Sequence, residues 1–149
     1  EDPLGVPNNI MPLITRVASG KINFLEVYGN DYETHDGTGI RDYIHVVDLA
    51  RGHVASMEAM QRKESPSLIQ VNLGVGKGVS VFELIKNFEQ STGINIPFKV
   101  RSRREGDLAA VYSDVSLSKK VLGWEAKFGI KEMCIDAWNW QKKNPKGYL

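Results

Sequence analysis

The apolar positions along this chain predict five helices. In each segment, apolar residues recur at the i, i+3, i+4 spacing that places them on one helix face. Ser80 and Glu83 have the spacing of a capping box, which indicates a helix start. The predicted helices span residues 9–18, 48–60, 80–89, 114–122 and 130–142. One stripe of the helix predicted at 48–60 carries Leu49, His53, Met57 and Met60.

Short strands alternate with these helices. Apolar runs bounded by turn residues predict strands, and clusters of Gly, Asn and Asp around residues 29–39 predict a polar loop. The extended segments are expected at residues 24–28, 41–46, 68–73 and 98–101. Because helices and short strands alternate, the chain is predicted to form an α/β or α+β domain.

Composition and charge exclude several classes of function. The chain has 149 residues, 42% of them hydrophobic, which is enough for one domain with its own core. Its net charge of +1 gives no basic excess, so neither nucleic acid nor an anionic membrane is an expected partner. No apolar run approaches the ~18 residues of a membrane span. The chain opens at Glu1 without a Met, so we expect a piece of a longer protein.

The residue types that most often carry chemistry favour structural interpretations here. Cys134 shares a predicted helix face with Ile130 and Trp138, so a buried thiol is expected instead of a nucleophile. As the single cysteine it cannot form an internal disulfide, which suits a reducing compartment such as the cytoplasm. The three histidines lack the Cys or carboxylate array of a metal site, so no metal is expected.

A glycine-rich turn, Gly-Val-Gly-Lys-Gly at residues 74–78, lies between a predicted strand and a predicted helix. A dinucleotide-binding turn would occupy this place, with backbone amides directed at a phosphate. The spacing, however, fits neither G-x-G-x-x-G nor the P-loop, and the position near Gly93 offers no acid for a ribose. A tight strand-to-helix turn is therefore the preferred interpretation, and a self-sufficient cofactor site is the alternative.

The remaining polar residues suit a dianionic ligand with hydroxyl groups. Arg41 ends a glycine-rich loop, and residues 103–107 place two guanidiniums beside two carboxylates. A guanidinium donates paired, charge-assisted hydrogen bonds to phosphate oxygens. Asn8 and Asn9 supply amides that both donate and accept. The set indicates a sugar-nucleotide site, and the alternative is a solvated charge run whose ion pairs contribute ~0–1 kcal/mol each.

An ordered series of motifs resembles the UDP-galactose 4-epimerases, members of the extended short-chain dehydrogenase/reductase family. The resemblance covers essentially the whole chain and corresponds to the carboxy-terminal, sugar-nucleotide-binding part of those enzymes. It implies an α/β fold with helices around a small mixed sheet. It also implies that residues 1–149 form one substrate-binding domain, without the amino-terminal Rossmann half that binds NAD. The motifs lie at residues 7–12, 29–32, 36–46, 72–74, 103–107, 122–124 and 138–141.

The same resemblance implies a set of substrate-binding residues. The first loop contributes to the nucleotide site, and residues 26–28 flank the uracil, with backbone groups reading its edge. Arg41 and Arg104 hold the diphosphate, Asp107 holds the uridine ribose, and Val111 faces the sugar near C2. Glu26 departs from the small or polar residue expected there. The implied site residues are Asn8, Asn9, Ile10, Glu26, Val27, Tyr28, Arg41, Tyr43, Val81, Arg104, Asp107 and Val111.

The resemblance also implies a reaction for the intact enzyme. NAD takes a hydride from C4 of the sugar and returns it to the other face, interconverting UDP-galactose and UDP-glucose. A Tyr-x-x-x-Lys pair and a Ser or Thr handle the proton, and this sequence contains no Tyr-x-x-x-Lys, so no catalytic residue is expected here. The chain alone is expected to be inactive, and the intact enzyme is expected to be a cytoplasmic homodimer. The alternatives are a related decarboxylase or dehydratase, or a non-catalytic binding fragment.

Overall fold

The computed structural model describes residues 7–62 and 68–147. Helices and short strands alternate along them, which confirms the predicted α/β class. Most predicted element boundaries lie within a few residues of the observed ones. The elements are α1 (Ile10–Ala18), β1 (Leu25–Tyr28), β2 (Ile40–Arg41), α2 (Val46–Met60), β3 (Val79–Ser80), α3 (Val81–Thr92), β4 (Phe98–Arg101), β5 (Ala110–Val111), α4 (Ser116–Leu122) and α5 (Ile130–Lys143).

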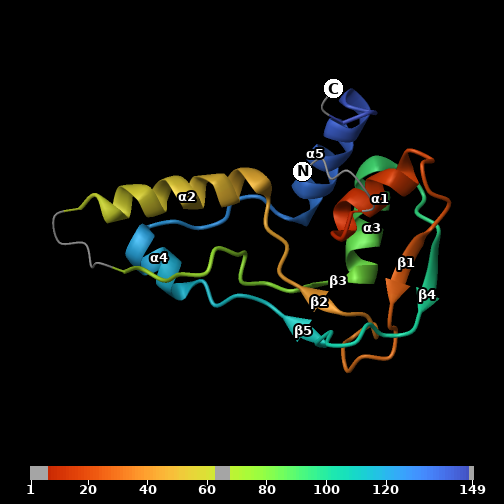
Figure 1. The fold of residues 1–149 in the computed structure, drawn as a ribbon, viewed down its shortest axis with the longest axis horizontal. Helices are drawn as coiled ribbons and strands as arrows, with labels where there is room; N and C mark the ends of the chain where they lie inside the picture. The colour runs from red at the N-terminus through yellow and green to blue at the C-terminus, as the bar shows by residue number, and fades with distance from the viewer. Residues whose placement is uncertain (1–6, 63–67, 148–149) are drawn as a thin grey trace.

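The elements form two regions, which Figure 1 shows at opposite ends of the long axis. In the first, which we call the body, α1, α3 and α5 pack together beside the strands β1 and β4. In the second, which we call the arm, α2 and α4 pack against each other. The short strands β2, β3 and β5 lie between the two regions (Figure 1).

The body has a continuous apolar core. Leu84 and Phe88 on α3 are fully buried, as are Ile14 on α1 and Cys134 on α5. The capping box that starts α3 is present as predicted, because the Ser80 hydroxyl accepts from the Glu83 amide and the Glu83 carboxylate accepts from the Ser80 amide. Leu25 and Val27 of β1 belong to the same core, so the apolar faces of the amphipathic helices pack against this strand.

Two small sheets carry the loops that matter for the site. β1 pairs in parallel with β4, in a register that sets Glu26 opposite Lys99. β2 is the central strand of the other sheet, antiparallel to β3 and parallel to β5. The expected extended segment at 41–46 is shorter in the structure, because the side chain of His45 caps α2 by accepting from the Val47 amide. The helix consequently begins two residues before its predicted start.

The stripe predicted for α2 is not the buried one. Met57 and Met60 are 63% and 67% exposed, whereas Gly52 and Ala59 are buried. Close packing explains which face of α2 is buried, because a Cβ on Gly52 would lie 2.8 Å from Leu73 Cδ1 and 3.2 Å from Trp124 Cε2. A helix that approaches its neighbours this closely presents its small residues to them, and the bulkier apolar residues lie on the other side.

The strand predicted at residues 68–73 is also absent from the described part of the chain. Exposed and half-buried side chains alternate along this segment, as they do in a strand. Ile69, Val71 and Leu73 pack against the arm core formed by Leu122 and Trp124. The segment has the side-chain period of a strand, but no hydrogen-bonded neighbouring strand lies beside it among the described residues.

Candidate functional site

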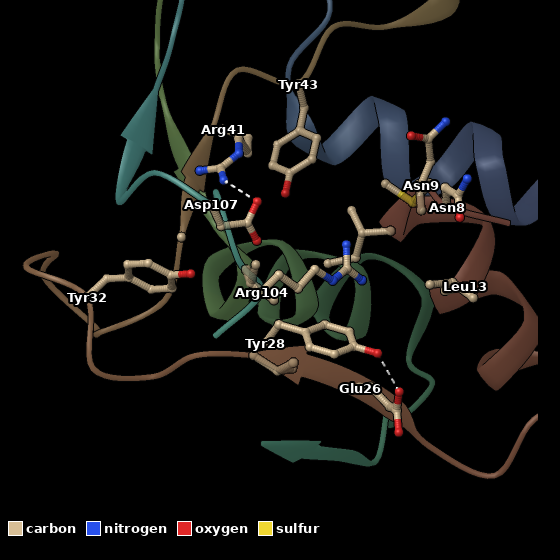
Figure 2. Close-up of a pocket in the computed structure, with 15 residues that line it drawn as sticks. Asn8, Asn9, Leu13, Glu26, Tyr28, Tyr32, Arg41, Tyr43, Arg104 and Asp107 are labelled. Atoms are coloured by element: carbon tan, nitrogen blue, oxygen red, sulfur yellow. Dashed lines mark hydrogen bonds and ion pairs between the residues drawn. The ribbon is translucent and has the colours of Figure 1, made fainter. Parts of the chain in front are cut away.

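A pocket of about 370 Å³ opens on the body where several loops meet. Its walls come from the start of α1, the strand β1, the end of β2, the start of α3 and the loop before β5. The volume lies in the range of small-molecule sites. All the site residues implied by the resemblance line this pocket except Val111, and Figure 2 shows the polar ones on the elements around it.

The wall formed by α1 brings amides and apolar groups to the pocket. Asn9 is the N-cap residue of α1, with an extended backbone, and Asn8 precedes it. Ile10 and Leu13, on the first turn of the helix, also line the pocket. Because the helix turns its first residues toward the cavity, this wall can offer both hydrogen-bonding and van der Waals contacts to a ligand.

The wall formed by β1 carries a hydrogen-bonded pair. The Tyr28 hydroxyl donates to Glu26 Oε2 at 2.6 Å, and Glu26 Oε1 accepts from Arg101 on β4. The hydrogen bond from Tyr28, followed by that from Arg101, lowers the pKa of Glu26. The guanidinium of Arg104 lies over the Tyr28 ring, 3.9 Å from its centroid. One face of this ring is therefore covered by a cation, and the hydroxyl is fixed by a carboxylate.

The opposite wall is charged. Arg41 donates to the carbonyl oxygens of Ile40 and Leu108 at 2.8 and 2.9 Å, and its other terminal nitrogen lies 3.4 Å from Asp107 Oδ1. These contacts tie β2 to the loop before β5. Nearby, burial raises the pKa of Tyr43 to about 12, although Arg41 opposes the shift. A tyrosine is protonated at neutral pH even at its ordinary pKa, so the Tyr43 hydroxyl can donate a hydrogen bond there.

The polar loop at residues 29–39 is held in place from within. Asp36 Oδ1 accepts from the amide and hydroxyl of Thr38 at 2.9 and 2.7 Å, and its Oδ2 accepts from the Ser80 hydroxyl. Burial raises the pKa of Asp36, but the hydrogen bonds from Ser80 and Thr38 outweigh it and leave the pKa below its usual value. Thr38 in turn accepts from the amide of Val81. The network joins the loop to α3 and fixes the position of Gly39 at the pocket.

Some lining residues were missed from sequence. Met11 and Leu13 follow Ile10 on α1, and Gly39 and Tyr32 belong to the polar loop. Tyr32 lies within one of the motifs that carry the resemblance. Its place in a turn-rich loop, however, does not indicate whether its side chain points toward the pocket or toward solvent. Conversely, Val111 in β5 is 46% exposed and lies outside the pocket lining, with its Cα opposite that of Arg41.

The glycine-rich turn at residues 74–78 is not available to a dinucleotide. Its amides at Val75 and Gly76 donate to the two carboxylate oxygens of Asp42 at 2.9 and 3.0 Å. A Cβ on Gly78 would lie 2.3 Å from Ile40 Cγ2, so this glycine serves close packing. The described residues therefore do not fit NAD at this turn, and the structural interpretation holds.

The sequence also raised the single cysteine and the histidines as candidates. Cys134 is fully buried in the body core, and burial raises the pKa of its thiol to about 12. Within residues 7–62 and 68–147, no group of three or more His, Cys, Asp or Glu side chains is arranged to hold a metal ion. None of the helices found in these ranges is long and apolar enough to cross a membrane.

Comparison with known proteins finds similar sequences and folds among enzymes named for sugar-nucleotide substrates. Residues 2–137 match the family model described as GDP-mannose 4,6 dehydratase. The chain is 54% identical to the UDP-glucose 4-epimerase of Haemophilus influenzae over 149 residues and 51% identical to that of Homo sapiens. These matches cover 99% of this chain but 43% and 42% of the relatives, so the chain spans less than half of their length.

Solved structures agree with these sequence matches. UDP-glucose 4-epimerase from Bifidobacterium longum, in complex with NAD+ and UDP, superposes with a TM-score of 0.93 at 48% identity. The enzyme from Stenotrophomonas maltophila, with bound NAD and formylated UDP-arabinopyranose, gives 0.92 at 45% identity. This chain is covered to 99% and 97% in the two comparisons, and the solved chains to 43% and 42%.

Proposed function

This chain belongs to the GDP-mannose 4,6 dehydratase family, and from that premise we propose that it is the carboxy-terminal, UDP-sugar-binding part of a UDP-glucose 4-epimerase. The main observation behind this proposal is the pocket, whose lining residues come from five separate segments of the chain. The relatives named UDP-glucose 4-epimerase, at about half identity across the whole chain, support the same assignment.

The charges of the pocket suit a diphosphate between a base and a sugar. In this proposal Arg41 and Arg104 neutralise the diphosphate, because planar guanidiniums donate paired hydrogen bonds to phosphate oxygens. Asp107 accepts from the uridine ribose, and the backbone of β1 at Glu26 and Tyr28 reads the uracil edge. Asn8, Asn9 and Ile10, with Tyr43 and Val81, complete the walls.

Two contacts of the pocket change when UDP binds in this way. Arg104 covers one face of the Tyr28 ring, so it leaves that face in order to reach the diphosphate. Asp107 faces Arg41, so a ribose hydroxyl shares or replaces that ion pair. Both contacts are partly exposed, and exchanging them for ligand contacts costs little. An exposed cation–π contact contributes ~0.5–1 kcal/mol, and an exposed ion pair contributes ~0–1 kcal/mol.

The chemistry at C4 requires the rest of the enzyme. NAD, which solved relatives bind, would be held by an amino-terminal half that lies outside this chain. The residues of this chain hold and orient the UDP-sugar, and the acid–base residues come from the other half. We further propose that the whole protein is a homodimer in the cytoplasm.

A second candidate is another NAD-dependent enzyme acting on a sugar nucleotide. The family description names a dehydratase, and MoeE5, solved with UDP-glucuronic acid and NAD, is 26% identical with a TM-score of 0.73. The pocket residues that would bind UDP are common to both possibilities. The difference lies in which sugar is turned over, so a substrate comparison separates them.

The test is an activity assay on the full-length protein. With NAD present, we expect interconversion of UDP-glucose and UDP-galactose, and no release of carbon dioxide from UDP-glucuronic acid. The isolated chain of 149 residues is expected to be inactive under the same conditions. Interconversion by the isolated chain, or turnover of UDP-glucuronic acid alone by the full-length protein, would contradict the proposal.

A further inference from the structure

Tyr32 is a pocket residue whose hydroxyl has no partner within the described parts of the chain. The side chain is 6% exposed, and the hydroxyl oxygen is buried without a hydrogen bond. Leaving such a group unpaired is unfavourable, and buried polar groups in folded proteins are nearly always satisfied. Tyr32 also lines the pocket described above. An unpaired donor in this position indicates that a ligand supplies the missing acceptor.

The ring that carries this hydroxyl packs against Gly29 and Arg103. Gly29 lies against it so closely that a Cβ there would come within 2.5 Å of Tyr32 Cε2. On the ring face, the Arg103 guanidinium lies 4.3 Å from the centroid, a cation–π contact. The ring therefore has little freedom to rotate, and its hydroxyl is pre-positioned.

Arg103 is bonded to the loop that carries Tyr32. Arg103 Nε donates to Asp31 Oδ1 at 2.8 Å, and a terminal nitrogen of Arg103 donates to the Asp31 carbonyl. The Tyr32 amide donates to the carbonyl of Gly37 at 2.9 Å, which closes the loop. These contacts account for the backbone and for Arg103 but leave the tyrosine hydroxyl unused. Arg103 thus holds the ring, whereas the adjacent Arg104 lines the pocket.

We propose that Tyr32 is a ligand-binding residue whose hydroxyl donates a hydrogen bond to the diphosphate of the bound nucleotide. In the view of Figure 2 its ring enters from the side of Arg41 and Asp107, across the pocket from Asn8 and Asn9. The pocket's charged wall is the part suited to phosphate oxygens, which are strong acceptors. The inference rests on the proposed function, because it assumes that the pocket binds a UDP-sugar.

The conservative variant Tyr32→Phe removes only the hydroxyl, because the phenyl ring can keep its contacts with Gly29 and Arg103. Tyr112→Phe is the matched control, because Tyr112 is 62% exposed and lies outside the pocket lining. Dissociation constants for UDP and for uridine are measured by calorimetry on the full-length wild type and both variants. Melting temperatures without nucleotide are measured on the same samples.

We expect Tyr32→Phe to weaken UDP binding roughly tenfold, as the loss of one hydrogen bond to a charged group does. Uridine affinity is expected to stay the same, and the melting temperature without nucleotide should not fall, because the hydroxyl has no partner to lose. Tyr112→Phe should match the wild type in every measurement.

Three results would overturn the inference. An unchanged affinity for UDP would show that the hydroxyl does not contact the ligand, and equal losses for UDP and uridine would move the contact away from the diphosphate. A clear fall in melting temperature would reveal a structural partner for the hydroxyl. Failure of the wild type to bind UDP is a separate result, because it contradicts the proposed function itself.

Discussion

The body and the arm bury their apolar residues to very different extents. In the body, the largest apolar side chains of three helices meet in one core, and Phe88 and Leu84 are fully buried. In the arm, the buried core consists of Ala59, Leu122 and Trp124, with partly buried neighbours. Several large apolar side chains of the arm instead face outward, among them Val46, Val54, Met57, Met60 and Leu117.

From this difference we infer that the arm needs a further partner to cover its apolar side chains, whereas the body buries its own. The body buries most of its large apolar side chains in its own core, and it carries the pocket. An exposed apolar patch such as that on α2 commonly marks a surface that another part of a protein covers. Under the proposed function, that cover is the part of the enzyme that this chain, at 43% of the relatives' length, does not include.

The largest expected effect comes from the body core. Phe88→Ala removes a fully buried ring that meets Trp138 edge-on, with centroids 6.3 Å apart. We expect the free energy of unfolding of the full-length protein to fall by about 3–5 kcal/mol, because the variant leaves a cavity. Phe98→Ala, at a side chain that is 44% exposed, should cost clearly less in the same denaturant titration. Equal losses would contradict the description of the body core.

The next effect concerns the two pocket arginines. Arg41→Ala and Arg104→Ala should each weaken UDP binding at least tenfold, since a hydrogen bond to a charged group contributes about 1.5–3 kcal/mol. They should differ in stability, because Arg41 also bonds two backbone carbonyls, each worth about 0.5–1.5 kcal/mol, whereas Arg104 lies over a ring. Calorimetry and thermal melting on both variants check this, and unchanged UDP affinity in both would refute the assignment.

A smaller effect tests the arm. Met57 is 63% exposed in the structure. If it stays exposed, Met57→Ser should change the free energy of unfolding by no more than about 0.5 kcal/mol. If the rest of the enzyme covers α2, Met57→Ser in the full-length protein should instead cost about 1–2 kcal/mol of burial. Glu58→Ser, at the neighbouring exposed position, is the control in the same unfolding measurement. A negligible loss for Met57→Ser would show that the arm stays uncovered.

The smallest effect concerns substrate breadth. Valine at position 111 lacks a ring, so we propose that the space near C2 of the sugar is open to an N-acetyl group. The full-length enzyme should then interconvert UDP-N-acetylglucosamine and UDP-N-acetylgalactosamine, and Val111→Tyr should lower kcat/KM for this pair about tenfold through overpacking. The simple sugars should be unaffected. Val111 does not line the pocket in this structure. Equal losses of kcat/KM for the acetylated and the simple sugars would therefore show that the residue at position 111 does not act on the substituent at C2.

The sequence predicted the body better than the arm, and the reason is physical. The helix α3 was predicted well because its capping box and apolar period agree with the packing it makes. The strand β4 was predicted at its observed bounds, although all four of its residues are exposed. In the arm, the period alone could not tell which stripe of α2 is buried, since the deciding contact is the closeness of Gly52 to Leu73. The segment at 68–73 has a strand pattern, but a strand also needs a partner, which local sequence does not specify.

The candidate site shows the same division between local and distant information. The resemblance supplied most of the pocket residues between Asn8 and Asp107, and the fold brings them together. Tyr32 could not be assigned from sequence, because its importance arises from the positions of Gly29 and Arg103 around the ring. Likewise, only the structure reveals that Arg104 covers Tyr28 and that Asp42 occupies the amides of the glycine-rich turn.

A crystal structure of the full-length protein with UDP tests the central claim most directly. The account predicts uracil against the backbone of β1, the diphosphate between Arg41 and Arg104, and the ribose at Asp107. It also predicts that Arg104 contacts the diphosphate and has left the face of the Tyr28 ring, whose centroid lies 3.9 Å from its guanidinium in this structure. Density for UDP outside this pocket, with Arg104 still over Tyr28, would contradict the account.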